Sequence, residues 1–137
     1  MITYQLVIRL LEDSRIRIGK LGEFNFPAGL YIYTGSAKNN LHARVSRHLS
    51  RTKKIRWHID YLLDSPHAEI INIKTSSLEE CKLNQLTEGE ILIENFGATD
   101  CKNGCRSHLK YLGNESHGVT YMASCSCTTS YFPGRMA

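Results

Sequence analysis

The sequence lacks the features that would place it in a membrane, in the secretory pathway or among disordered proteins. Residues 1–15 have no charged segment ahead of their apolar run, include Arg9, and are too few to span a bilayer. No segment has the biased composition of a disordered or fibrous protein, and neither an internal repeat nor a linker is present. We therefore expect one cytoplasmic globular domain with no membrane partner, since 137 residues suffice for one hydrophobic core.

Cysteines are few and odd in number. The five are Cys81, Cys101, Cys105, Cys125 and Cys127. An odd number without an export signal disfavours a disulfide framework and favours thiols or metal ligands. One interpretation is a tetrahedral structural zinc (Zn²⁺) site, although the spacings are irregular for known zinc modules. Its candidate ligands are Cys101, Cys105 and His108, with Cys125 and Cys127 downstream. Buried free thiols are the alternative.

Acidic residues are absent from one long stretch of the chain. The net charge is only +4, but residues 38–56 contain no Asp or Glu. The cations of this stretch are Lys38, Arg44, Arg47, Arg51, Lys53, Lys54 and Arg56. Such clustering predicts a polyanionic partner, and a solvated helix face is the alternative explanation.

Strand patterns dominate the first third of the chain. Residues 4–11 alternate between two faces, and a shorter alternation at residues 16–18 indicates a partner strand. Residues 29–35, GLYIYTG, follow the breaker Pro27 and predict a third strand that Gly35 closes. Three strands are therefore expected before the first helix.

From residue 40 the apolar spacing becomes helical. Leu41, Val45 and Leu49 recur every fourth residue, which predicts a helix of about three turns with Asn39 or Asn40 as its N-cap. The same spacing places Arg44, His48 and Arg51 together on an adjoining face, where cations can meet a phosphate. A neutral His48 could also carry a proton there.

The rest of the chain continues the mixed pattern. The expected elements are a short helix within residues 55–63, a strand over 68–74, a further helix, and a cysteine-rich loop before a last strand. The further helix is expected to begin with a capping box, in which Ser76 and Ser77 are followed by Glu79 and Glu80, and to run toward Gly89. Beyond Gly113 we expect a weak strand over 119–124 and a loose tail. The order β, β, β, α, α, β, α, β predicts an α+β domain.

Several motifs occur together and in order. They are ITY (2–4), YTG (33–35), LHARVSRHL (41–49), WHIDYLL (57–63), FGATDC (96–101) and SHL (107–109). Together they resemble the GIY-YIG nuclease superfamily, and within it the Uri-type branch. The resemblance covers roughly residues 2–112. It implies a nuclease-like domain over residues 1–112, with a small, mainly antiparallel central sheet flanked by helices, and a C-terminal extension over 113–137.

The resemblance also implies an activity, that of an endonuclease that hydrolyses DNA with a divalent metal. Tyr4 and Tyr33 take the places of the two motif tyrosines, one of which activates water in this family. Arg44 matches the arginine of the first helix, which suits the charge that develops on phosphorus. His48 and His58 match, or lie close to, histidines of the homing-endonuclease branch.

The metal and substrate contacts follow from the same resemblance. Glu80, with Glu79 as second choice, takes the place of the single glutamate that holds Mg²⁺ or Mn²⁺. The residues expected to contact DNA are Gly35, Ser36, Lys38, Arg47, Arg51, Lys53 and Lys54. Two other interpretations remain: a non-catalytic nucleic-acid-binding module, and a zinc-stabilised interaction domain in which the tyrosines only pack.

Overall fold

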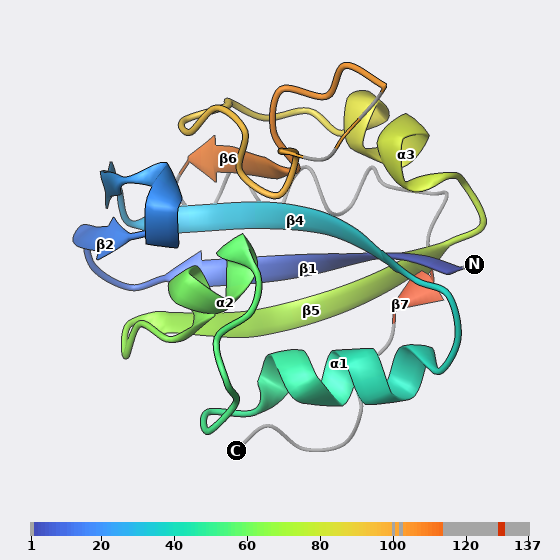
Figure 1. Cartoon of the computed structure of the whole chain (residues 1–137), viewed down its shortest axis with the longest axis horizontal. Helices are drawn as coiled ribbons and strands as arrows, with labels where there is room; N and C mark the ends of the chain where they lie inside the picture. Colours follow the sequence, from blue (N-terminus) through green and yellow to red (C-terminus); the bar gives the residue numbers. More distant parts are fainter. Residues whose placement is uncertain (1, 100, 102, 114–128, 131–137) are drawn as a thin grey trace.

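The computed structural model (Figure 1) describes residues 2–99, 101, 103–113 and 129–130. Its strands are β1 (Ile2–Leu10), β2 (Ser14–Arg17), β3 (Glu23–Phe26), β4 (Gly29–Ala37), β5 (Ala68–Ser76), β6 (Leu109–Gly113) and β7 (Thr129–Ser130). Its helices are α1 (Leu41–Leu49), α2 (His58–Leu63) and α3 (Glu80–Leu86), with a 3-10 turn η1 (Gly19–Leu21). The predicted α+β class is confirmed.

The main sheet is antiparallel and has the order β6-β4-β1-β5-β7. Its centre is β1, which pairs along its whole length with β4 and with a bulge against β5. Strands β2 and β3 form a separate two-stranded sheet at one end of the domain (Figure 1). Nearly every residue of β1 is buried, because elements cover both faces of the strand.

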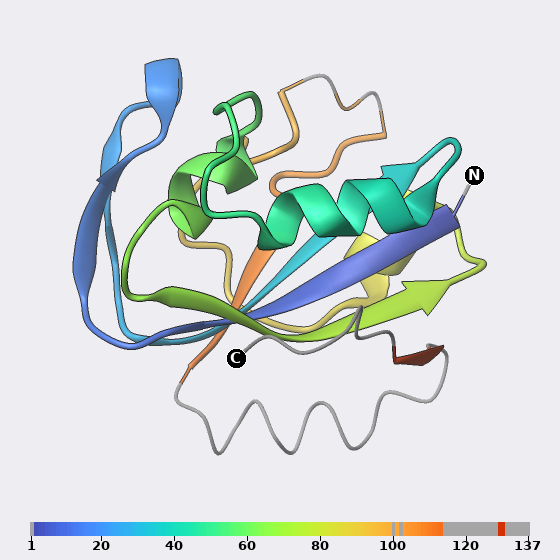
Figure 2. The same cartoon turned by 90° about the horizontal axis from the view of Figure 1, so that it is seen from below.

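The two faces of β1 meet different helices. Figure 2 shows α1 and α2 on the same side of the sheet. Successive side chains of a strand point to opposite faces of its sheet. Tyr4 reaches His48 of α1 on one side. On the other side Gln5 donates a hydrogen bond of 2.8 Å to Thr87, which follows α3. The sheet is thus packed between α1 and α2 on one face and the α3 region on the other.

The expected N-cap of the first helix is confirmed. Asn40 adopts the left-handed conformation that asparagine tolerates, and its side chain accepts a hydrogen bond of 3.1 Å from the Ala43 amide. The apolar stripe is narrower than expected, because Val45 is buried whereas Leu41 and Leu49 are half-buried. None of the described helices combines the length and the apolar composition that crossing a bilayer requires.

Three expectations about the elements were wrong. Four strands, not three, precede α1, because residues 23–26 pair with β2 as β3. The expected capping box is absent: Ser76 ends β5, Glu79 is the N-cap of α3, and no side chain caps that helix. Helix α3 ends at Leu86 rather than near Gly89. The expected strand over 119–124 lies outside the described residues, and so does most of the expected loose tail, but Thr129 and Ser130 of that tail pair with β5 as strand β7.

Candidate functional site

The side chains of Tyr4 and His48 form a buried pair that joins the central strand to α1. The Tyr4 hydroxyl oxygen lies 2.7 Å from His48 Nε2, and the two residues are 1% and 2% exposed. We expected His48 to lie with Arg44 and Arg51 on one basic face of the helix, but His48 is buried, whereas Arg44 is half-buried and Arg51 is exposed. The histidine turns inward because the tyrosine from β1 offers it a polar partner beneath the helix.

A glycine makes room for this pair. Gly35 lies directly opposite Tyr4 in the β1–β4 register. A Cβ atom at Gly35 would lie 2.8 Å from the Tyr4 hydroxyl oxygen and 3.1 Å from the Tyr33 ring. The absence of a side chain therefore lets both aromatic rings converge at the end of β4. Tyr33 is half-buried, and its ring centroid lies 6.3 Å from that of His48.

Arg44 is held against the same strand end. Its guanidinium donates a hydrogen bond of 3.0 Å to the Ser36 carbonyl and lies 4.7 Å from the centre of the Trp57 ring. Trp57 has Arg47 on its ring as well, at 4.3 Å. The tryptophan is therefore a platform for two cations as well as a packing residue.

Glu80, the first residue of α3, meets β4 from the neighbouring side. One carboxylate oxygen accepts a hydrogen bond of 2.5 Å from the Ser36 hydroxyl, and the other lies 2.8 Å from His108 Nδ1. The Glu80 side chain remains 27% exposed. Burial alone would raise the pKa of Glu80, but the hydrogen bonds from His108 and Ser36 lower it below its ordinary value. Glu80 is therefore a carboxylate at neutral pH.

The two tyrosines are protonated at neutral pH. Burial raises the pKa of Tyr4 to about 12, although the charge and hydrogen bond of Arg44 act in the opposite direction. Burial also raises the pKa of Tyr33, and the neighbouring Tyr4 and Glu80 raise it further. Burial lowers the pKa of His48 to about 4, so its ring is neutral at neutral pH and one ring nitrogen can accept a hydrogen bond.

Three of the cations predicted to contact DNA donate hydrogen bonds within the protein. Arg47 forms a pair of bonds with Asp60, at 3.0 and 2.9 Å, and Asp60 is completely buried. Arg51 donates to three carbonyl groups between α2 and β5, at 2.7 to 3.1 Å. Lys53 donates to two carbonyl groups at the end of α1. These contacts hold α1 to α2 and to the start of β5.

The remaining predicted residues lie around the same region. Lys38 and Lys54 have exposed side chains, one before α1 and one after it. His58, the first residue of α2, accepts a hydrogen bond of 2.8 Å from the Gly97 amide, and its ring lies 5.6 Å from that of Phe96. The histidine therefore ties α2 to the connection between α3 and β6.

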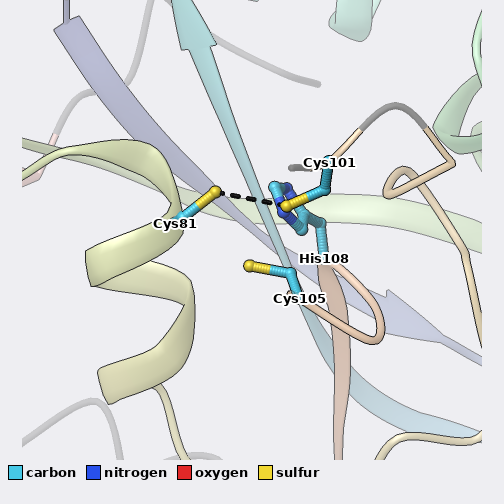
Figure 3. Close-up of side chains that lie close together, drawn as sticks. All are labelled: Cys81, Cys101, Cys105 and His108. Carbon is cyan, nitrogen blue, oxygen red and sulfur yellow. Dashed lines mark hydrogen bonds between the residues drawn. The ribbon is translucent and has the colours of Figure 1, made fainter. Parts of the chain in front are cut away.

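A second group of polar side chains lies beside Glu80. Figure 3 shows Cys81 of α3, two cysteines of the following connection and His108 pointing toward one another. The set is Cys81, Cys101, Cys105 and His108, and its ligand atoms all lie within 4.8 Å of one another. These four side chains can hold a metal ion. Cys125 and Cys127, the other two candidates, lie outside the described residues.

One of these thiols ionises easily. Burial would raise the pKa of Cys101, but hydrogen bonds from the Asn103 and Cys105 amides and from neighbouring thiols bring it to about 6. Burial raises the pKa of Cys81 to about 12. Hydrogen bonds therefore favour the thiolate of Cys101, whereas burial favours the thiol form of Cys81, which an ion would have to deprotonate.

Comparison with known protein families places the chain in a family. A family model described as a domain of unknown function, DUF123, matches residues 3–130. The chain belongs to the DUF123 family. The DUF123 match includes all the site residues above. No curated protein matches the chain, and no solved structure matches it.

Sequence reasoning missed Cys81 as a member of the cysteine cluster. Cys101, Cys105 and His108 follow one another closely, and a tetrahedral ion needs one more ligand. Cys81 is the single cysteine upstream of this group, and it directly follows Glu80. That position was a usable signal, but only the fold shows that the start of α3 lies against the connection that carries the other ligands.

Proposed function

We propose that this chain is a divalent-metal-dependent endonuclease of the GIY-YIG type that hydrolyses phosphodiester bonds in DNA. One observation carries the proposal: residues predicted from separate motifs converge from four elements on the end of β4. They are Tyr4 of β1, Tyr33 of β4, Arg44 and His48 of α1, and Glu80 of α3. Packing alone does not require a carboxylate, a guanidinium and two phenols around one glycine.

Tyr4 has the better chemistry for activating water. Arg44 favours its phenolate, and the neutral ring of His48 accepts the hydrogen bond of the Tyr4 hydroxyl at Nε2, so the phenol proton is released to solvent when the phenolate forms. The water oxygen then bonds to phosphorus as the bond from phosphorus to the leaving sugar oxygen breaks. The water proton passes to the Tyr4 phenolate, and the leaving oxygen takes a proton from solvent. Tyr33, which is more exposed, contacts the phosphate.

Arg44 suits stabilisation of the transition state. Its guanidinium is anchored by the Ser36 carbonyl and the Trp57 ring, so one edge is fixed before substrate arrives. A preorganised cation beside the developing negative charge on phosphorus lowers the barrier without reorganisation at the moment of reaction. The exposed Lys38 and Lys54 extend this positive surface along the DNA backbone.

Glu80 fits the single metal ligand of this chemistry. It is ionised, partly exposed, and each carboxylate oxygen keeps a second lone pair beyond its bond to Ser36 or His108. Mg²⁺ and Mn²⁺ accept oxygen ligands, and Mg²⁺ retains most of its waters, so one protein carboxylate suffices. When bound, such an ion neutralises charge on the phosphate and its leaving group.

The free thiols of the described residues fit a reducing compartment such as the cytoplasm.

A non-catalytic DNA-binding module is the second candidate. The observation that favours it is the burial of Tyr4, whose residue surface is only 1% exposed. A base must come within hydrogen-bonding reach of the attacking water. If no opening exposes this hydroxyl, the convergent side chains serve binding and packing alone.

Cleavage assays test the proposal directly. Purified protein is incubated with labelled single-stranded, duplex and branched DNA in Mg²⁺ or Mn²⁺. We expect cutting of at least one substrate, and a loss of roughly 100-fold or more in rate for Tyr4→Phe and for Arg44→Ala. Tyr33→Phe is compared with Tyr4→Phe, because the larger loss identifies the base.

Two control variants match these substitutions. Tyr61→Phe removes a phenol that packs on Gly19, and Arg15→Ala removes a cation from the two-stranded sheet. Both are expected to cut at the wild-type rate. Wild-type protein that binds every DNA but cuts none would replace the enzyme with the binding module, and protein that neither binds nor cuts DNA would remove both candidates.

A further inference from the structure

We propose that Cys81, Cys101, Cys105 and His108 form a closed, structural zinc site in which Glu80 orients the histidine ligand. The site is separate from the Mg²⁺ or Mn²⁺ position proposed above, and its existence does not depend on nuclease activity. It rests on the positions of the four ligand atoms and on the hydrogen bonds of His108.

The spacing of the ligand atoms suits a single zinc ion. Zinc binds thiolate sulfur at about 2.3 Å, so two sulfur ligands at tetrahedral positions lie about 3.8 Å apart. The sulfur atoms of Cys81 and Cys101 lie 3.5 Å apart, and the whole set lies within 4.8 Å. Small side-chain adjustments therefore bring all four atoms onto one ion.

His108 supplies the second, independent observation. Its ring is 3% exposed, and its Nδ1 lies 2.8 Å from a Glu80 oxygen. Its Nε2 is buried and has no hydrogen-bond partner among the described residues. A buried nitrogen without a partner costs free energy, and native structures rarely leave one unexplained. Coordination of an ion at Nε2 satisfies this atom.

The carboxylate fits the usual surroundings of a histidine ligand. A histidine that binds zinc through one ring nitrogen commonly donates the N–H of the other to a carboxylate, which fixes the tautomer and the ring orientation. Glu80 is placed for this role, and its other oxygen accepts from Ser36. The site thus has its outer support as well as its ligands.

The donor set identifies the ion and its role. Thiolates and imidazole suit zinc and exclude Mg²⁺ or Ca²⁺, which take oxygen ligands. Four protein ligands complete the tetrahedron and leave no position open for a substrate or an activated water. The site is therefore structural and not catalytic.

A metal cross-link would also stabilise the connection between α3 and β6. In the described part of residues 87–108 no helix or strand forms, apart from an isolated bridge at Glu90. Cys81 lies on α3 before this connection, and His108 lies directly before β6 after it. An ion bound by both ends and by two cysteines within the connection offsets the entropy of ordering it.

Metal analysis and thiol protection test the site in the wild-type chain. Protein purified under reducing conditions is expected to contain about one zinc per chain. Alkylation mapped by mass spectrometry should show Cys81, Cys101 and Cys105 protected, and chelation should expose them. Cys125 and Cys127 should react equally before and after chelation. A chain without stoichiometric metal, or with the same alkylation pattern after chelation, would overturn the proposal.

Variants test the ligands and the orienting carboxylate. Cys105→Ser should lose the zinc, whereas the matched control Cys127→Ser should retain it. Glu80→Gln should retain zinc with an affinity 10- to 100-fold weaker, measured by competition with a chromogenic chelator. Equal zinc loss from both cysteine variants would overturn the ligand set, and an unchanged affinity in Glu80→Gln would overturn the orienting role. Because none of these readouts requires cleavage, an inactive enzyme would leave the zinc result intact.

Replacement of zinc by Co²⁺ tests the site in the wild-type protein, so that the test does not depend on a variant that folds. Metal-free wild-type protein, refolded with Co²⁺ in place of zinc, should saturate at one equivalent. The spectrum should show the charge-transfer band of thiolate ligands and the visible bands of a tetrahedral ion. Octahedral bands without thiolate charge transfer would overturn the proposal.

Discussion

Acidification should destabilise the fold through His48, and this gives a sharp test of the buried tyrosine–histidine pair. The ring is neutral because burial lowers its pKa from 6.5 to about 4. In the unfolded chain it regains the ordinary value. Between these two values the unfolded state binds a proton that the folded state does not, so stability falls as the pH drops below about 6.5.

The size of the effect follows from the shift. One pKa unit corresponds to about 1.4 kcal/mol, so complete protonation of His48 lowers the free energy of unfolding by roughly 3 kcal/mol. Most of this loss is expected between about pH 7.5 and about pH 4.5, and it is a large part of the 5–15 kcal/mol that typically stabilises a domain. Urea unfolding followed by far-ultraviolet circular dichroism at the two pH values measures it.

His48→Gln isolates the contribution of this side chain. Glutamine keeps a hydrogen-bonding group near the Tyr4 hydroxyl but does not titrate, so the variant should lose roughly 2–3 kcal/mol less on acidification than the wild type. Other titrating groups are common to both proteins and cancel in the difference. Tyr4→Phe should lose about 1 kcal/mol at both pH values and keep the wild-type acid sensitivity, because burial is the main cause of the shift. Equal acid losses in the wild type and His48→Gln would refute the reasoning.

Three further outcomes follow from the same geometry. Gly35→Ala should lower the free energy of unfolding by roughly 1–3 kcal/mol and reduce DNA cleavage, because the new Cβ would lie 2.8 Å from the Tyr4 hydroxyl oxygen. Wild-type stability of this variant in urea would contradict the prediction. Arg47→Ala should lower the free energy of unfolding by about 3–5 kcal/mol in the same assay, since the buried Asp60 loses its charged partner and keeps the Arg56 and Trp57 amides. A loss below about 1 kcal/mol would show that the ion pair is dispensable. Lys54→Ala should weaken binding to all DNA sequences and reduce the slope of log affinity against log salt by about 1, as measured by fluorescence anisotropy; an unchanged slope would place Lys54 outside the interface.

Local patterns predicted the parts of the fold that depend on local physics. Strand alternation identified β1, and the four-residue spacing with an asparagine before it identified α1 and its cap. Strand β3 was missed because it has only four residues and exposes two of them, so its alternation is short and includes little apolar surface. The length of α3 was overestimated because the polar residues after Leu86 resemble a solvated helix face.

The site was predictable as a set of residues but not as an arrangement. Motif order singled out Tyr4 and His48, yet helix periodicity alone put the histidine on the surface. Only the β1–β4 register, which sets Gly35 opposite Tyr4, shows why the Tyr4 hydroxyl has room beneath α1 and why the His48 ring turns inward to meet it. Cys81 escaped notice for the same reason, since its proximity to Cys101 depends on how α3 packs and not on any local spacing.

Glu80 is where the two proposals constrain each other. Its two oxygens face different partners, the Ser36 hydroxyl at the end of β4 and the His108 imidazole. An ion at the cysteine cluster would fix His108, and through it the direction in which the carboxylate presents its remaining lone pairs. The nuclease proposal needs those lone pairs aimed at a hydrated metal beside Arg44. A zinc ion at this cluster, by ordering the connection between α3 and β6, would then give a lone, partly exposed carboxylate a defined direction.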